Sequence, residues 1–412
     1  MKFNTKLLHS ARDVSDHSGA TLPAIHQSSA FAHESSEKLE KVFDNKAPGF
    51  AYTRIGNPTV NTFEKRMAEI EGGFGAVACA SGMAAISMTL LAILKSGDEI
   101  ISSAALFGGT LDLLTDLEDL GIHTTYVDYV TPESIEAQIN ANTKAVFTEL
   151  IGNPRLDVVD VKAIAEVTKR YNIPLIIDAT TSTPALIRPF EYGANIVIHS
   201  ASKYISGSGN AISGIIIDSG RFAWDFEKYP TLARYKQMGK LAFTAKLKND
   251  TWKNYGACLS PQNAYIGLVG LETLGLRMER LCDNALALAE ALQIHVENHE
   301  IAEVTYPGLS SSRYKEVSTA QFEKGRAGAI LTIKAGSKEK AWSIIDNLKY
   351  ASVATNIGDV RTLVIHPAST IYGHSTQEQL DCAGVTSDLI RVSVGLEDIE
   401  DLIADFTQAI IT

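Results

Sequence analysis

Short apolar runs alternate with segments of helical periodicity from about residue 75 to residue 217. The runs are brief and bounded mostly by Gly, Pro, Asp or Ser, which is typical of strands buried on both faces. They cover residues 76–80, 99–102, 124–127, 145–150, 175–177, 196–198 and 212–217. Between two of these runs, Leu111, Leu114, Leu117 and Leu120 recur at helical spacing. The alternation predicts an α/β fold with a large, mostly parallel sheet covered by helices.

The regions on either side of this core have different patterns. Residues 1–58 are rich in Ser, His and Gly, as in Ser15-Asp16-His17-Ser18, and show little periodicity, which is typical of a segment that wraps a partner or serves a site. One amphipathic helix follows and ends at Gly72-Gly73. After Pro261 a helical pattern runs to about Leu292, and strand and helix signals then mix. We predict an arm at 1–58, a large domain at 59–260 and a smaller α+β domain at 261–412.

Composition and charge narrow the class of protein. The 412 residues are 45% hydrophobic and 21% charged, as in an ordinary folded chain. Lys and Arg number 37 against 48 Asp and Glu, a net charge of −11 without a local basic patch, so we expect no nucleic-acid partner. The first residues lack an apolar signal region, and the most apolar helical stretch, 84–94, is too short to span a bilayer. We therefore expect a cytoplasmic protein without a membrane segment.

The cysteines show no metal or redox spacing. Cys79, Cys258, Cys282 and Cys382 are far apart in the sequence, without a CxxC motif or a nearby His. We expect reduced thiols in the core and no metal site.

One glycine-rich motif is misplaced for nucleotide binding. Residues 73–78 match the G-x-G-x-x-A fingerprint, which must follow a strand and open a helix. Here the motif follows a predicted helix and enters a predicted strand, so it does not indicate a dinucleotide site.

Three polar features follow the ends of predicted strands. Ser81-Gly82-Met83 opens a helix, where free N–H groups can bind an anion unless Ser81 simply caps the helix. Asp178 ends the strand at 175–177, where open α/β sheets bind ligands, or caps the next turn. Lys203 follows the next strand and is either solvated or able to form a Schiff base. Together these features supply the phosphate site, the anion and the amine that bind pyridoxal 5′-phosphate (PLP).

Six motifs resemble those of the Cys/Met-metabolism enzymes that use PLP, in the same order and over essentially the whole chain. They are Tyr52–Thr59, Ser81–Ala85, Phe107–Thr110, Asp178–Thr180, Ser200–Lys203 and Arg391–Asp398. The resemblance implies the fold-type I architecture of PLP-dependent transferases such as aspartate aminotransferase. It further implies a homotetramer of active dimers, in which the arm reaches the neighbouring subunit.

The same resemblance assigns roles to individual residues. Lys203 would bind the cofactor covalently and later move protons, and Asp178 would pair with the ring nitrogen. Arg391 would bind the substrate carboxylate, with a strand-edge arginine as the alternative interpretation. Asn356 and Tyr52 would also lie at the substrate. The remaining cofactor contacts implied are Ser81, Gly82, Met83, Phe107, Asn153, Thr180, Ser200 and Ser202, with Tyr52 and Arg54 from the neighbouring subunit.

One position departs from the family pattern. Phe107 stands where most relatives have Tyr, so stacking on the cofactor ring is kept but no hydroxyl is available to move a proton. We hypothesise that Tyr52 and Lys203 carry the acid–base work.

The C-terminal region resembles the O-acetylhomoserine sulfhydrylases. Residues 356–359 read Asn-Ile-Gly-Asp where cystathionine synthases and lyases usually have Ser-Leu-Gly-Gly, and Gly109 stands where methionine γ-lyases usually have Cys. The resemblance implies γ-replacement on O-acetyl-L-homoserine by sulfide or methanethiol. Methionine or cystathionine γ-lyase and cystathionine γ-synthase activities are the alternatives. The sequence leaves open an acetyl or succinyl substrate, and free sulfide, methanethiol or the thiocarboxylate of a sulfur-carrier protein as donor.

Overall fold

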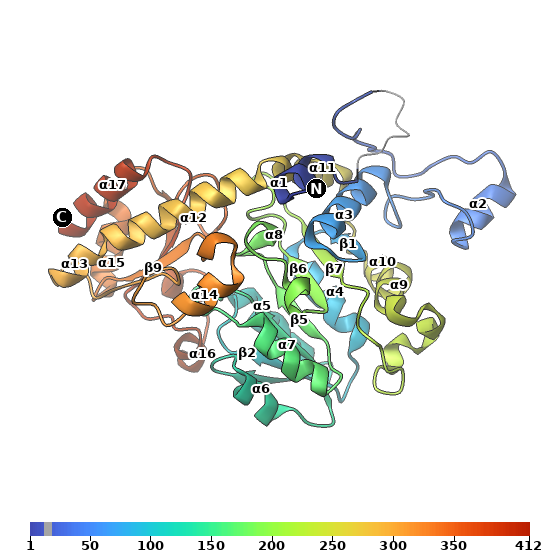
Figure 1. Cartoon of the computed structure of the whole chain (residues 1–412), viewed down its shortest axis with the longest axis horizontal. Helices are drawn as coiled ribbons and strands as arrows, with labels where there is room; N and C mark the ends of the chain where they lie inside the picture. The colour runs from blue at the N-terminus through green and yellow to red at the C-terminus, as the bar shows by residue number, and fades with distance from the viewer. Residues whose placement is uncertain (12–18) are drawn as a thin grey trace.

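The computed structural model describes residues 1–11 and 19–412, so the Ser15-Asp16-His17-Ser18 stretch lies outside the described residues. A seven-stranded sheet occupies the first half, in the order β1-β7-β6-β5-β4-β2-β3 (Figure 1). Its strands are β1 (Gly75–Cys79), β2 (Glu99–Ser103), β3 (His123–Val127), β4 (Thr143–Glu149), β5 (Leu175–Asp178), β6 (Ile196–His199) and β7 (Gly214–Asp218). Only β7 runs against its neighbours, which confirms the predicted mostly parallel sheet.

Helices cover both faces of this sheet. Alternate residues of its strands belong to two different apolar clusters, one on each face. Val77 and Ile176 pack with α4 (Gly82–Ile93) and α5 (Gly108–Glu118) on one face. Ile177 packs with α3 (Pro58–Glu71) and α7 (Val161–Arg170) on the other. The shorter helices of this half are α6 (Pro132–Gln138), α8 (Thr183–Leu186), α9 (Ala242–Lys246) and α10 (Trp252–Tyr255), with η1 (Pro189–Tyr192), η2 (Pro230–Leu241) and η3 (Leu247–Thr251).

Asn57 caps α3 by accepting a hydrogen bond from the Thr59 N–H, and Pro58 occupies the first turn. Gly72 ends the helix in the left-handed region, at φ 80°. The motif at residues 73–78 therefore does lead from a helix into β1, as predicted.

A smaller five-stranded sheet, ordered β10-β11-β12-β9-β8, forms the C-terminal part. Its strands are β8 (Glu303–Thr305), β9 (Ile330–Lys334), β10 (Ser352–Val353), β11 (Leu363–Ile365) and β12 (Leu389–Ser393), antiparallel except for β10 with β11. The helices are α11 (Pro261–Glu272), α12 (Leu274–Ala291), α13 (Gln293–Glu297), α14 (Lys315–Gln321), α15 (Lys338–Asn347), α16 (Gln377–Cys382) and α17 (Ile399–Ile411), with η4 (Glu323–Gly325) and η5 (Pro367–Ser369). The helical pattern predicted to run from Pro261 to Leu292 is divided at Thr273. The smaller α+β part is confirmed, and the domain boundaries at 58 and 260 stay predictions.

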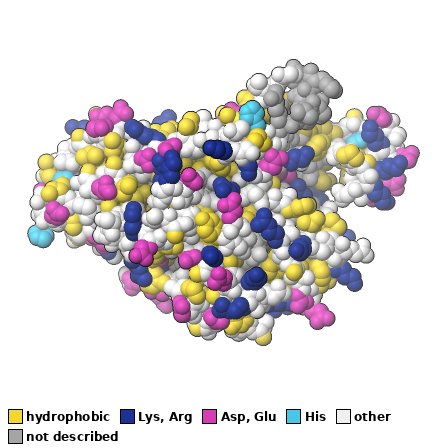
Figure 2. Space-filling view, in the orientation of Figure 1, with side chains coloured by type: hydrophobic (Ala, Val, Ile, Leu, Met, Phe, Trp, Pro, Cys, Tyr) yellow, Lys and Arg dark blue, Asp and Glu magenta, His cyan; other side chains and the backbone are white. Residues whose placement is uncertain are grey.

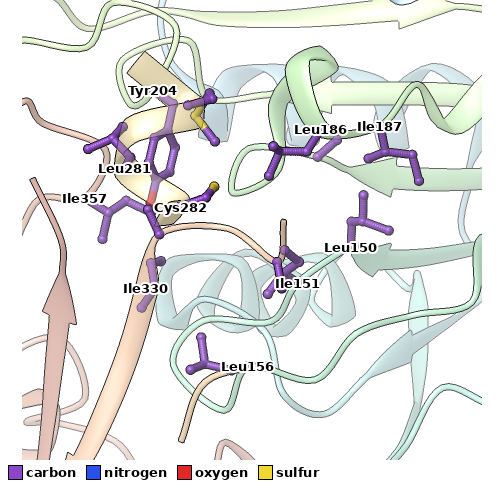
Figure 3. Packing of buried hydrophobic residues seen from close by; sticks show 14 of the residues in the cluster. Leu150, Ile151, Leu156, Leu186, Ile187, Tyr204, Leu281, Cys282, Ile330 and Ile357 are labelled. Atoms are coloured by element: carbon purple, nitrogen blue, oxygen red, sulfur yellow. The ribbon is translucent and has the colours of Figure 1, made fainter. Parts of the chain in front are cut away.

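One apolar cluster joins the two sheets. Leu281 and Cys282 of α12 lie beside Tyr204, close to Ile330 of β9 and Ile357 (Figure 3). The helix α12 runs from one part of the molecule to the other (Figure 1). Its close packing against both parts fixes the position of one sheet relative to the other.

The described part of the N-terminal region contains two short helices that the sequence analysis did not predict. Leu7 of α1 (Phe3–His9) is buried in the main core. The second, α2 (Ser36–Phe43), has no buried residue and stands apart from the body at the end of an extended segment (Figure 1).

The surface carries side chains of both charges. Lys and Arg side chains are interspersed with Asp and Glu on the face shown in Figure 2. Among the described residues, none of the helices combines the length and the apolar character needed to cross a membrane.

Candidate active site

A cavity of about 250 Å³ lies where β4, β5 and β6 end, at the carboxyl edge of the parallel strands. It brings together most of the residues proposed from the sequence. Those that line it are Ser81, Gly82, Met83, Phe107, Asn153, Asp178, Thr180, Ser200, Ser202, Lys203 and Arg391.

The start of α4 forms one wall of the cavity. The Ser81 hydroxyl accepts a hydrogen bond from the Ala84 N–H at 3.0 Å, so the capping interpretation is correct. A Cβ at Gly82 would lie 2.6 Å from the Ser200 Cβ, and only glycine allows this close approach. The N–H groups of Gly82 and Met83 have no acceptor within the helix and carry its positive dipole end. The cap and the unpaired N–H groups suited to an anion are therefore both present at this helix start.

Asp178 lies at the end of β5 and is 9% exposed. Its Oδ1 accepts a hydrogen bond from the Thr180 N–H at 2.9 Å, so it also caps the following turn. Thr180 in turn accepts from the Ser200 N–H at 2.7 Å. Burial raises the pKa of Asp178, and its hydrogen bonds with Thr180 oppose that effect. This arrangement holds a carboxylate in a site that needs a cationic partner.

Lys203 reaches the cavity from the turns after β6. Its Nζ donates a hydrogen bond to Asn356 Oδ1 at 2.6 Å, across from the C-terminal part of the chain. Burial, with a smaller effect from the charge of Arg391, lowers the pKa of Lys203 to about 8. Roughly a tenth of the amine is therefore neutral and nucleophilic at pH 7, far more than for an ordinary lysine.

The hydroxyl of Ser202 is engaged within the protein. It donates to the Ser213 carbonyl at 3.0 Å and accepts from the Ser213 N–H at 2.8 Å. These bonds fasten the turn that carries Lys203 to the residue before β7.

Arg391 lies in the middle of β12 and is only 2% exposed. Its guanidinium donates to Asn153 Oδ1 at 3.2 Å and to the carbonyls of Asn356 and Thr355 at 3.1 and 3.3 Å. Within the described residues its Nε has no partner, and burial lowers the pKa to about 10. A buried cation with donor capacity left over suits a carboxylate ligand.

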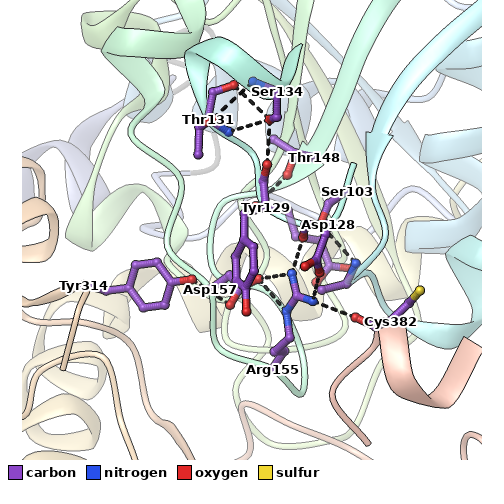
Figure 4. Close-up of polar contacts among 12 residues, drawn as sticks. Ser103, Asp128, Tyr129, Thr131, Ser134, Thr148, Arg155, Asp157, Tyr314 and Cys382 are labelled. Carbon is purple, nitrogen blue, oxygen red and sulfur yellow. Dashed lines mark hydrogen bonds and ion pairs between the residues drawn. The ribbon is translucent and has the colours of Figure 1, made fainter. Parts of the chain in front are cut away.

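The loop that carries Asn153 is anchored by Arg155 (Figure 4). This guanidinium binds Asp157 and Asp128, each at 2.6 Å, and the Cys382 carbonyl at the end of α16 at 2.8 Å. The position of Asn153 is thereby tied to both parts of the molecule.

Glu149 is a cavity residue that the sequence reasoning missed. It ends β4 beside Asp178 in the sheet register, and its two oxygens accept the N–H groups of Phe107 at 2.7 Å and Asn153 at 3.1 Å. Burial and the charge of Asp178 raise the pKa of Glu149 to about 8. The available signal was a carboxylate at the next-to-last position of the predicted apolar run 145–150, and the structure ends β4 at that residue.

Three predicted site residues are not among those lining the cavity. Asn356 is adjacent and contacts Lys203 directly. Tyr52 is 43% exposed, and the Arg54 guanidinium lies 5.6 Å from its ring centroid while donating to the Lys253 carbonyl at 2.8 Å. Neither Tyr52 nor Arg54 contributes to the cavity of its own chain.

The cavity fits PLP. The glycine at the start of α4 leaves its N–H groups accessible to a phosphate, Asp178 matches a protonated ring nitrogen, and the Lys203 amine can react with an aldehyde. Arg391 remains for the carboxylate of an amino acid. The two-sheet fold and this cavity together define a PLP-dependent enzyme of fold type I.

The chain belongs to the family of Cys/Met metabolism PLP-dependent enzymes, whose profile matches residues 4–411. It is similar to the O-acetyl-L-homoserine sulfhydrylase of Corynebacterium glutamicum, with 40% identity over 98% of this chain and 95% of that protein. It is 38% identical to the homocysteine synthase of Schizosaccharomyces pombe, over 99% of this chain and 98% of the relative. A solved structure of a putative O-acetylhomoserine (thiol)-lyase from Campylobacter jejuni, containing N′-pyridoxyl-lysine-5′-monophosphate, matches with a TM-score of 0.95, 34% identity and full coverage of both chains.

Proposed function

We propose that this chain catalyses γ-replacement on O-acetyl-L-homoserine, in which sulfide displaces acetate and L-homocysteine forms; methanethiol would give L-methionine. The observation that carries the proposal is the cluster of Arg391, Asn153 and Asn356 beside Lys203, which presents a carboxylate site next to an amine. The full-length similarity to a sulfhydrylase and a homocysteine synthase supports the same reaction.

Different residues of the cavity would bind different parts of the cofactor. The N–H groups of Gly82 and Met83, with the hydroxyls of Ser81 and Ser200, would bind the phosphate, and Phe107 would pack on the ring. Asp178 would keep the ring nitrogen protonated, and Thr180 orients its carboxylate. When bound, PLP supplies an electron sink that stabilises negative charge on the substrate carbons.

Arg391 and Lys203 act on the substrate itself. The guanidinium of Arg391 binds the α-carboxylate, and Asn153 fixes the plane of the guanidinium. Lys203 Nζ would hold the cofactor through its aldehyde and would take and return the proton at the α-carbon, and Asn356 Oδ1 orients the amine. Because Phe107 has no hydroxyl, we assign further proton transfer to Tyr52 from a second copy of the chain.

The position of the arm supports a proposal about the assembly. Tyr52 and Arg54 lie away from the cavity of their own chain, so we propose that each active site takes these residues from a partner, within a homotetramer of active dimers in the cytoplasm.

A turnover assay tests the proposal. The holoenzyme is incubated with O-acetyl- or O-succinyl-L-homoserine and with sulfide, methanethiol, a carrier-protein thiocarboxylate or cysteine, and the products are identified by mass. We expect homocysteine from the acetyl ester with sulfide, and none from Lys203→Ala. Formation of 2-oxobutyrate at the same rate with and without sulfide would instead establish a γ-lyase, and cystathionine formed only with cysteine would establish a cystathionine γ-synthase.

A further inference from the structure

Cys79 and Cys258 are distant in the sequence but lie opposite each other in the structure. Cys79 ends β1, and Cys258 forms an isolated antiparallel bridge with it from the segment before α11. The Ala80 N–H donates to the Ala257 carbonyl at 2.9 Å. A bond between these flanking residues identifies a non-hydrogen-bonded pair, in which the Cα atoms approach to about 4.5 Å.

Both thiols also lie on the same face of the sheet. Cys79 belongs to the apolar cluster that contains Val77, and Cys258 packs against that cluster. Ala78, between Val77 and Cys79 on β1, belongs to the cluster on the opposite face. Burial raises the pKa of the Cys79 thiol well above its ordinary value, and the charges of Glu64 and Cys258 add to this effect, so Cys79 is a protonated thiol and the slower nucleophile of the two.

A Cα separation of this size lies within the range that disulfides span, about 4.4 to 6.8 Å, so the bond needs no large backbone movement. Access is unequal. Cys79 is fully buried, whereas Cys258 is partly exposed and lines a cavity of about 370 Å³ with Glu64, Lys248 and Trp252.

We infer that Cys79 and Cys258 form a redox-active pair, which closes to a disulfide when a peroxide reaches Cys258. The Cys258 sulfur attacks the peroxide O–O bond and becomes a sulfenic acid, with release of one water. The Cys79 sulfur then displaces the hydroxyl as a second water. The two thiols lose two electrons and two protons, and hydrogen peroxide is reduced to two waters. The new bond joins residue 258 to the strand that leads into the Ser81 turn of the active site.

Oxidation of the holoenzyme with hydrogen peroxide tests this inference. After alkylation in denaturant and digestion without reductant, we expect one cross-linked peptide pair joining Cys79 and Cys258, which dithiothreitol releases. The alkylatable thiols should fall from four to two per chain. Cys258→Ser should abolish the cross-link, and the matched variant Cys382→Ser, at another partly exposed cysteine, should keep it.

The variant Cys79→Ala provides an independent test of the reaction between the two thiols. Without its partner thiol, Cys258 should accumulate a sulfenic acid that dimedone traps. The inference is overturned if oxidised wild-type protein retains an alkylatable Cys79, if Cys258 proceeds to a sulfinic acid without a cross-link, or if Cys258 pairs with another cysteine.

Discussion

Glu149 is held between two loops that carry cavity residues. One oxygen accepts the Phe107 N–H and the other the Asn153 N–H, so this single carboxyl positions the proposed ring-stacking residue and the neighbour of Arg391 together. Its pKa, raised from 4.5 to about 8 mainly by burial, means that the folded chain holds the neutral acid at neutral pH. Lys203, lowered to about 8, is partly neutral in the same range. The cavity therefore carries less net charge than its residue types indicate, which reduces the cost of burying these groups.

The raised pKa makes a prediction about stability. Between pH 4.5 and 8 the unfolded chain ionises Glu149 while the folded chain keeps it protonated. The contribution of Glu149 to the free energy of unfolding is therefore complete below pH 4.5 and is lost as pH rises to 8. The loss is at most about 1.4 kcal/mol per pH unit. Glu149→Gln removes this dependence but forfeits one backbone hydrogen bond, a cost of about 1 to 3 kcal/mol. We expect the variant to be less stable than wild type at pH 5 and the deficit to shrink or reverse at pH 8.

Urea unfolding of the cofactor-free chain at several pH values measures this difference. The matched variant Glu290→Gln changes an exposed carboxylate on α12, and its effect should be small and nearly constant with pH. A deficit for Glu149→Gln that stays the same from pH 5 to pH 8 would contradict the raised pKa.

At the scale of elements, a serine and an aspartate cap two helices with the same hydrogen-bond length but lie in different surroundings. Ser81 caps α4 at the cavity, and Asp160 caps α7 away from it, each accepting a backbone N–H at 3.0 Å. We expect Ser81→Ala and Asp160→Ala each to lower the free energy of unfolding by about 1 kcal/mol. Only Ser81→Ala should also weaken PLP binding, by roughly tenfold, because its hydroxyl would donate to the phosphate. Fluorescence titration of the cofactor-free variants with PLP measures this; equal affinities would limit Ser81 to capping.

The elements that the sequence predicted well are those with a strong local signal. Every predicted apolar run overlaps a strand of the large sheet, and Gly72 ends α3 as its position indicated. The helix α2 was missed because it spans only eight residues, too few for its periodicity to stand out. The contact of Lys203 with Asn356 and the pairing of Cys79 with Cys258 could not be read from spacing, since each depends on how distant segments pack. Cys258 and Cys382 are also only partly buried, which corrects the expectation that every cysteine lies in the core.

At the scale of the molecule, the active site depends on contacts that join its two parts. Arg391 and Asn356 come from the C-terminal part, and Asp178 and Lys203 from the large sheet and its turns. The shared core around α12 and the Arg155 contacts hold these groups in place (Figures 3 and 4). The arm does not contribute in the same way, because Tyr52 and Arg54 lie outside the cavity of their own chain.

Because Arg54 lies outside the cavity of its own chain, we expect activity to return when two inactive variants, one altered at Lys203 and one at Arg54, are mixed. In a mixed dimer of Lys203→Ala and Arg54→Ala chains, one site would combine an intact Lys203 with an intact Arg54 from the partner. Random pairing makes half of the dimers mixed, so refolding an equal mixture should recover up to about a quarter of wild-type turnover. Mixing Lys203→Ala with Asp178→Ala is the matched control, because both residues line the cavity of one chain and no complete site can form. A mixture with Arg54→Ala that is no more active than its parents would mean that each chain uses its own arm.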